Sequence, residues 1–155
     1  NMKKNLILNI IAVLALFTFS FVQKKIEPCN IVELRKASKP LLTPYNYDSQ
    51  LLKRITFKNP ITLETEIPLS FFGEYRLVLN TDGMPVKVPI NIYNKEKQAK
   101  KRELLWSNES YSETDKIMVY TPQARTRRVF VDIEVPADSL NQKTKGCIYM
   151  TLGYK

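Results

Sequence analysis

The sequence contains no histidine, and only four glycines and two cysteines among its 155 residues. Without histidine it lacks the commonest general base and the commonest metal ligand, which excludes serine triads, cysteine–histidine pairs and histidine zinc sites. Two cysteines cannot form a structural zinc site, and the sparse glycines leave no phosphate-binding loop. We therefore expect a protein that is not an enzyme and that has neither a metal nor a cofactor.

Long apolar runs are absent except near the start of the chain. Met2-Lys3-Lys4 precedes an apolar segment from Leu6 to Val22. A basic start, an apolar core and small residues near a cut are typical of a bacterial signal peptide. We expect residues 1–22 to be removed on export, with a cut after Ser20 or after Val22. The alternative is an uncleaved leader that acts as a membrane anchor.

Acidic residues are outnumbered by basic ones, 15 to 24, which gives a formal charge of +9, or +7 once Lys3 and Lys4 leave with the leader. The surplus gathers in two segments, 95–102 and 125–128. The candidate binding residues form a basic surface of Lys97, Lys100, Lys101, Arg102, Arg125, Arg127 and Arg128. On an exported protein such a surface suits an acidic envelope protein, an anionic glycolipid or a cell-wall polymer, whereas nucleic acid is not accessible. A solvated basic face without a specific partner is the alternative.

The two cysteines, Cys29 and Cys147, stand far apart in the sequence. In an oxidising compartment, two cysteines in a small domain predict one disulfide bridge. In the chain-entropy model, closing so long a loop adds roughly 4–5 kcal/mol of stability. The alternative is a pair of buried free thiols.

From residue 51 onwards, apolar and polar residues alternate with period two, and turn signals such as Asn59-Pro60 interrupt the pattern. The pattern predicts strands at 51–58, 62–69, 74–80, 86–93, 102–107, 116–120, 128–135 and 146–154. Pro89 lacks an amide donor, so its strand is expected at a sheet edge or with a bulge. A short helix is predicted over 30–36, with Asn30 as its N-cap.

Eight short strands without intervening helices predict an all-β fold, a single β-sandwich that is either a jelly roll or immunoglobulin-like. The strand count favours the jelly roll. The expected organisation is a signal peptide at 1–22, a short helix and connector at 23–50, and the β-sandwich domain at 51–155.

Glycosidases need only two carboxylates, so carboxylate chemistry survives the lack of histidine. The candidates, such as Glu64, Asp132 and Glu134, fall on outward faces of strands, as solvated charges on a sheet do. Tyr93 and Phe130 also occupy polar-facing positions, which makes them candidates for an aromatic platform that stacks on sugar rings. The alternative is that the amino-terminal segment covers part of these faces.

Two resemblances accompany these patterns. The runs 73–79, 88–93 and 146–150 resemble the strand rhythm of bacterial pre-peptidase C-terminal-type jelly rolls, which are non-catalytic accessory modules on secreted proteins. The lysine-rich leader and the ending from Lys145 to Lys155 are similar to small uncharacterised exported β-sandwich proteins of Bacteroidota. Both resemblances imply an exported module, and neither implies a functional residue.

The sequence thus predicts a non-enzymatic, exported binding module or accessory subunit of an envelope assembly, in the periplasm or at the outer membrane and cell surface. Its contacts are expected on the basic surface, with an envelope protein or an anionic glycolipid or cell-wall polymer as partner. The alternative function is a carbohydrate-binding or glycan-processing secreted protein that uses the aromatic platform.

Overall fold

The computed structural model describes residues 29–70, 73–137 and 145–155. The predicted signal peptide and both of its cleavage positions lie outside the described residues. Within the described ranges, no helix is long and apolar enough to cross a membrane.

The described chain begins with a short helix, α2 (Ile31–Ser38), followed by one turn of 3₁₀ helix, η1 (Lys39–Leu42). The predicted N-cap is confirmed, because the Asn30 side chain accepts hydrogen bonds from the amides of Val32 and Glu33, at 3.1 and 3.4 Å. The helix runs two residues beyond the predicted end before the chain turns into the first strand.

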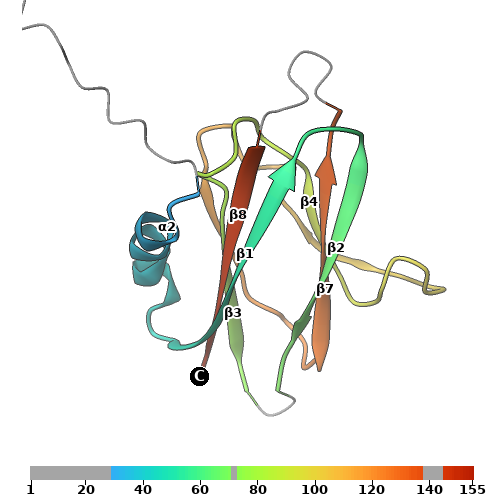
Figure 1. The fold of residues 1–155 in the computed structure, drawn as a ribbon. Helices are drawn as coiled ribbons and strands as arrows, with labels where there is room; N and C mark the ends of the chain where they lie inside the picture. The colour runs from blue at the N-terminus through green and yellow to red at the C-terminus, as the bar shows by residue number, and fades with distance from the viewer. Residues whose placement is uncertain (1–28, 71–72, 138–144) are drawn as a thin grey trace, which may run out of the picture.

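Eight strands follow, and they form two four-stranded antiparallel sheets that pack face to face (Figure 1). The strands are β1 (Asn46–Thr56), β2 (Ile61–Pro68), β3 (Tyr75–Asn80), β4 (Ile90–Tyr93), β5 (Leu104–Ser107), β6 (Ile117–Tyr120), β7 (Arg128–Val135) and β8 (Lys145–Tyr154). The first sheet has the order β1-β8-β3-β6 and the second has the order β2-β7-β4-β5. The predicted all-β sandwich is confirmed.

The connectivity identifies the sandwich as a jelly roll. The pairs β1–β8, β2–β7, β3–β6 and β4–β5 are nested one inside the next, and successive pairs alternate between the two sheets. The chain is therefore a single long hairpin rolled into two layers. Of the two predicted topologies, the jelly roll is the one that the structure adopts.

The starts of two strands differ from the sequence prediction by four or five residues, whereas the other boundaries differ by at most two. β1 begins at Asn46, inside the predicted connector, because its backbone pairing with β8 continues to Tyr154 where the side chains no longer alternate. β4 begins only at Ile90, because Pro89 has no amide to donate, although its carbonyl accepts from Glu134 at 2.9 Å. β4 lies inside its sheet, between β7 and β5, so the prediction of an edge position is wrong. Its pairing with β5 has a register shift between Ile92 and Tyr93, where the extra residue belongs to β5, so this irregularity is not the bulge predicted from Pro89.

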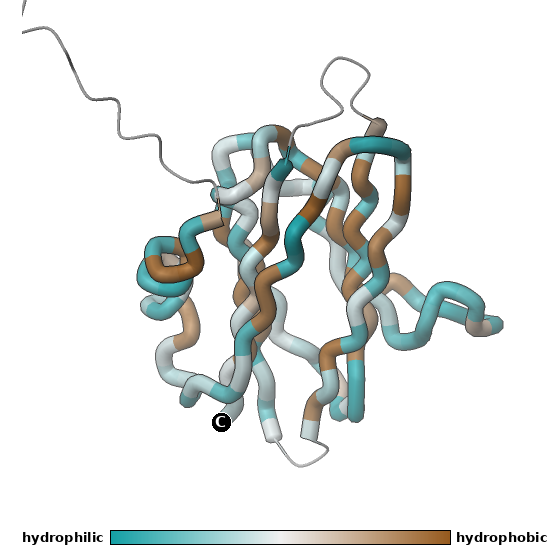
Figure 2. The backbone as a smooth tube through the Cα atoms, viewed as in Figure 1, coloured by the Kyte–Doolittle hydropathy of each residue, from teal (hydrophilic) through white to brown (hydrophobic). Residues whose placement is uncertain are grey.

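The main core lies between the sheets, where the inward side chains of both layers interdigitate. Its most buried members include Leu79, Ile90, Ile92, Val131, Ile133 and Ile148, each with an exposed fraction of 0%. Figure 2 shows the corresponding alternation of brown and pale segments along the strands. Burial of this apolar surface is the main driving force for the fold.

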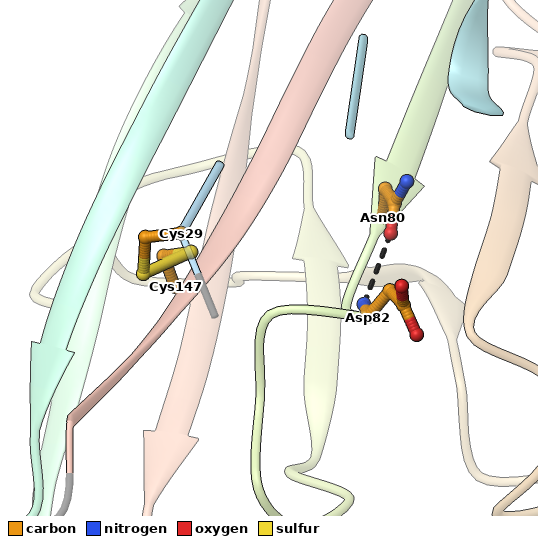
Figure 3. Close-up of a disulfide and its surroundings, with 4 residues drawn as sticks. All are labelled: Cys29, Asn80, Asp82 and Cys147. Atoms are coloured by element: carbon orange, nitrogen blue, oxygen red, sulfur yellow. Dashed lines mark hydrogen bonds between the residues drawn. A yellow bond between two sulfur atoms is a disulfide. The ribbon is translucent and has the colours of Figure 1, made fainter. Parts of the chain in front are cut away.

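A smaller apolar cluster lies on the outer face of the first sheet, under α2. Leu34 of the helix packs there against Cys147 and Tyr149 of β8, and Leu52 of β1 joins them. Cys29 and Cys147 form the predicted disulfide, with Cα atoms 5.7 Å apart and a sequence separation of 118 (Figure 3). The bridge links the residue two positions before α2 to the third residue of β8.

Asn80 holds the other end of the helix. Its side chain is fully buried, and its amide nitrogen donates to the Leu34 carbonyl at 3.2 Å and to the Ser38 hydroxyl at 3.1 Å. Its oxygen accepts from the Asp82 amide at 2.9 Å, as drawn in Figure 3. The helix is therefore attached near its start by the bridge and near its end by Asn80.

Candidate functional site

The loop between β4 and β5, residues 94–103, projects from the outer face of the second sheet, and we call it the basic arm. It is the yellow segment at the right of Figure 1, and Figure 2 shows it as hydrophilic over nearly all of its length. Its base is closed by Asn94 and Glu103, which exchange three hydrogen bonds of 2.9–3.2 Å through backbone and side-chain atoms. The arm therefore starts and ends at one fixed point of the sheet.

Arg102 fastens the arm to the sheet below it. Its two terminal nitrogens donate to the two carboxylate oxygens of Asp132, each at 2.8 Å, and one of them also donates to Glu64 at 2.9 Å. Its Nε donates to the Lys95 carbonyl at 2.8 Å, across the arm. Such bidentate, charge-assisted bonds are among the stronger polar contacts in proteins. One side chain thus joins both sides of the arm to β7 and β2.

The environment of Arg102 keeps it charged and inaccessible. The hydrogen bond with Asp132 raises its pKa above the ordinary arginine value, against the opposing effect of burial. Its side chain is 15% exposed, and its guanidinium lies 3.7 Å from the ring centroid of Tyr93. Although Arg102 belongs to the predicted basic surface, its charge is used within the molecule.

The lysines of the arm, unlike Arg102, are exposed and make no ion pairs among the described residues. Lys97, Lys100 and Lys101 are all exposed. Among the described residues, none of their ammonium groups has a carboxylate within ion-pair distance, since the salt bridges there involve only Arg102 and Arg128. The arm therefore presents at least three cations to solvent from a base that is held in place.

The second predicted basic segment lies in the loop between β6 and β7 and at the start of β7. Arg128 pairs with Glu66 at 3.1 Å, and both side chains are about half exposed. Arg127 and Arg128 line one hollow of about 410 Å³ together with Lys95 of the arm and with Phe130. The structure therefore brings the base of the arm and residues 127–128 to one surface, as the basic-surface prediction requires.

Other members of the predicted basic surface lie apart from this hollow. Arg125 is exposed and lines a separate hollow of about 590 Å³ with Gln123 and Lys155. Lys97 lines a third hollow, beside Glu134 and Pro89. The seven predicted residues therefore do not form one continuous surface, because Arg125 and Lys97 line hollows other than the one beside Arg127 and Arg128.

The predicted aromatic platform finds little support in the geometry. Tyr93 and Phe130 are cross-strand neighbours on β4 and β7. The Arg102 guanidinium lies over one face of the Tyr93 ring, and Phe130 is only 8% exposed. Little aromatic surface is thus left for stacking on a sugar.

The outward carboxylates of the second sheet are the feature whose partners the sequence did not reveal. Asp132 is 4% exposed, and it accepts both of its short hydrogen bonds from a residue 30 positions away. Within the described ranges, no group of three acidic, cysteine or histidine residues is placed to hold a metal ion. Two acids of this face, Glu64 and Asp132, fasten the arm.

No family model and no curated protein matches the chain. Among solved structures, it is similar to the crystal structure of Aeromonas hydrophila PliG, a periplasmic lysozyme inhibitor of g-type lysozyme. The two chains share 11% identity with a TM-score of 0.47, and the match covers 71% of this chain and 88% of that one.

Proposed function

We propose that this chain is a non-enzymatic exported protein of the periplasm or outer membrane that binds an acidic envelope protein through the basic arm. The observation that carries the proposal is the contrast within the arm. Arg102 is buried in ion pairs that fix the base, whereas Lys97, Lys100 and Lys101 are exposed and free of carboxylate partners among the described residues.

Export is supported by the bridge between Cys29 and Cys147, because structural disulfides form and persist in oxidising compartments. The basic and apolar leader expected at residues 1–22 agrees with it. A role without catalysis is supported by the lack of histidine in the whole sequence and by the engagement of Asp132 and Glu64 with Arg102.

The chemistry of the arm suits attraction and orientation of a partner. Lysine ammonium groups on flexible stems interact with carboxylates as point charges, and such contacts raise association rates more than they raise affinity. Binding through the arm is therefore expected to weaken as salt rises, since exposed charges are screened over about 10 Å at 0.1 M ionic strength.

The test is retention of envelope components on the immobilised protein, at low and moderate salt, followed by mass spectrometry. The wild type is compared with an arm variant, Lys97→Glu with Lys100→Glu, and with a matched control, Lys58→Glu with Lys145→Glu. Both variants change the net charge equally, and Lys58 and Lys145 are exposed residues outside the arm.

We expect one acidic protein to be retained in a salt-dependent way by the wild type and the control, and to be lost with the arm variant. If both variants lost the retained protein equally, the binding would depend only on net charge, and a role for the arm would be contradicted. Retention of glycolipid or cell-wall polymer alone would assign the arm to that class of partner, and salt-insensitive retention of neutral glycan would support the carbohydrate-binding alternative.

A further inference from the structure

Another hollow, of about 370 Å³, lies on the side of the sandwich opposite the basic arm, between α2–η1 and the outer face of the first sheet. Its volume is within the usual range for small-ligand sites, which runs from about 300 to 1,000 Å³. Residues from three separate parts of the sequence line it, including Arg35, Lys39, Leu42, Tyr47, Gln50 and Tyr149.

The polar centre of this hollow is the side-chain amide of Gln50. Its oxygen accepts two hydrogen bonds, from Arg35 Nε at 3.0 Å and from the Tyr149 hydroxyl at 2.8 Å. Because an arginine Nε can only donate, the atom facing it must be the amide oxygen, which fixes the orientation of the group. Among the described residues the amide nitrogen of Gln50 has no acceptor, so its two N–H donors remain available.

The charged side chains of the hollow also have hydrogen-bond donors without acceptors. Within the described part of the chain, the Arg35 side chain uses only its Nε, and the Lys39 ammonium group makes no hydrogen bond or ion pair. Among the residues that the structure describes, no acidic side chain lines the hollow. The free polar groups are thus two cations and an oriented amide N–H₂, a set that favours an anion with further acceptor atoms.

Apolar surface completes the hollow. Tyr47, one of its lining residues, is 57% exposed, so much of its side chain is open to solvent. Leu42, another lining residue, is buried at 4% exposure. An aromatic ring beside hydrogen-bond donors suits a ligand with one flat apolar face and a polar perimeter, which describes a pyranose ring better than a small inorganic ion.

We propose that this hollow binds an anionic saccharide unit, a pyranose ring that carries a carboxylate or a phosphate. The anionic group is held by Arg35 and Lys39, a ring hydroxyl accepts from the Gln50 amide, and the sugar face rests on Tyr47. The site is separate from the basic arm and does not depend on the function proposed for it.

The test is an NMR titration of the bridged protein with trigalacturonate, monitoring the side-chain amide of Gln50. Fully methyl-esterified trigalacturonate serves as the neutral analogue and inorganic phosphate as the bare anion. The variants are Arg35→Gln and Lys39→Gln, with Lys36→Gln as the matched control, because Lys36 is an exposed helix residue outside the lining. Tyr47→Ala and Tyr47→Phe test the contribution of the ring.

We expect trigalacturonate to shift the Gln50 amide signals and to bind about tenfold more weakly to the Arg35→Gln variant, as the loss of a charge-assisted hydrogen bond implies. Lys39→Gln and Tyr47→Ala should also weaken binding, while Lys36→Gln, Tyr47→Phe and the arm variant should bind like the wild type. The ester should not bind.

Three results would overturn the proposal. One is an unperturbed Gln50 amide at saturating trigalacturonate, and another is equal weakening by Lys36→Gln and Arg35→Gln. The third is phosphate binding as tight as that of trigalacturonate, which would leave an adventitious ion only. Melting temperatures of the variants separate loss of binding from loss of folding.

Discussion

The two outer faces of this sandwich arise from the same alternation of side chains along the strands, but they differ in burial and polarity. On the first sheet, Val78, Asn80, Cys147 and Tyr149 point outward and are each at most 1% exposed, because α2 and the bridge cover them. On the second sheet the outward positions include several acids, and Arg102 of the basic arm pairs with two of them, Glu64 and Asp132.

The difference shows that the alternation of a strand defines two faces but does not say which of them meets water. A face becomes a second core when a segment outside the sheet packs on it, and a polar surface when none does. The covered face is held by apolar contacts and a covalent bond, and the other by charge pairs. The two are therefore expected to respond differently to perturbation.

The strongest way to break the covered face is to remove the bridge. The double variant Cys29→Ala with Cys147→Ala should lower the free energy of unfolding by about 2–5 kcal/mol, since a native cross-link over a long loop restricts the unfolded chain. Denaturant titration followed by Trp106 fluorescence measures the change, because Trp106 packs near the rings of Tyr111 and Tyr120. A loss below ~1 kcal/mol would show that the helix holds the face without the bridge.

On the open face, Arg102→Met should cost about 3 kcal/mol, because it leaves Asp132 buried without its partner. Adding Asp132→Asn should recover part of the loss, since the stranded charge is then gone. Amide hydrogen exchange over residues 94–103 should rise in the single variant. Unchanged exchange there would mean that Arg102 does not fasten the arm.

A smaller effect is expected where one asparagine on each outer face can be compared. Asn80→Ala should cost about 2 kcal/mol, because it leaves buried partners in α2 and at Asp82 unsatisfied. Asn91→Ala should cost less than ~0.5 kcal/mol, because its single bond to Glu134 is exposed. If both variants lowered the free energy of unfolding equally, the proposed difference between the two faces would be contradicted.

The smallest effect concerns two ion pairs on the open face. Glu66→Gln should change the stability by less than ~0.5 kcal/mol, because Glu66 and Arg128 are both about half exposed and screened by water. Glu64→Gln should cost more, because its partner Arg102 is largely buried. The order of the two variants in a thermal melt checks this, and a reversed order would contradict the assignment of Arg102 as the fastening residue.

Much of the fold follows from the sequence. Period-two alternation predicted the eight strands, Asn30 marked the start of the helix, and two cysteines in a chain expected to be exported predicted the bridge. These features depend on local pattern or on simple counting. The start of β1 was missed because residues 46–50 are ordered by pairing with β8, about a hundred positions away, and not by their own alternation.

The candidate sites were predictable only in part, for the same reason. The sequence showed that 95–102 and 125–128 are basic, but not that Arg102 pairs with Glu64 and Asp132, which lie 38 and 30 positions away. The hollow beside α2 gave no signal, because Arg35, Gln50 and Tyr149 meet only once the helix packs on the first sheet. A sequence alone does not show whether an outward acid or an isolated arginine forms an ion pair.

The nested connectivity also sets an order of events as the chain is made. Among the described strands, β1 pairs only with β8, so the first of them to be synthesised has no partner until the last has appeared. Pairings across so many residues carry a high contact order, which is associated with slow folding. During that interval β1 exposes both of its hydrogen-bonding edges, and a factor that binds extended chains would find its target there.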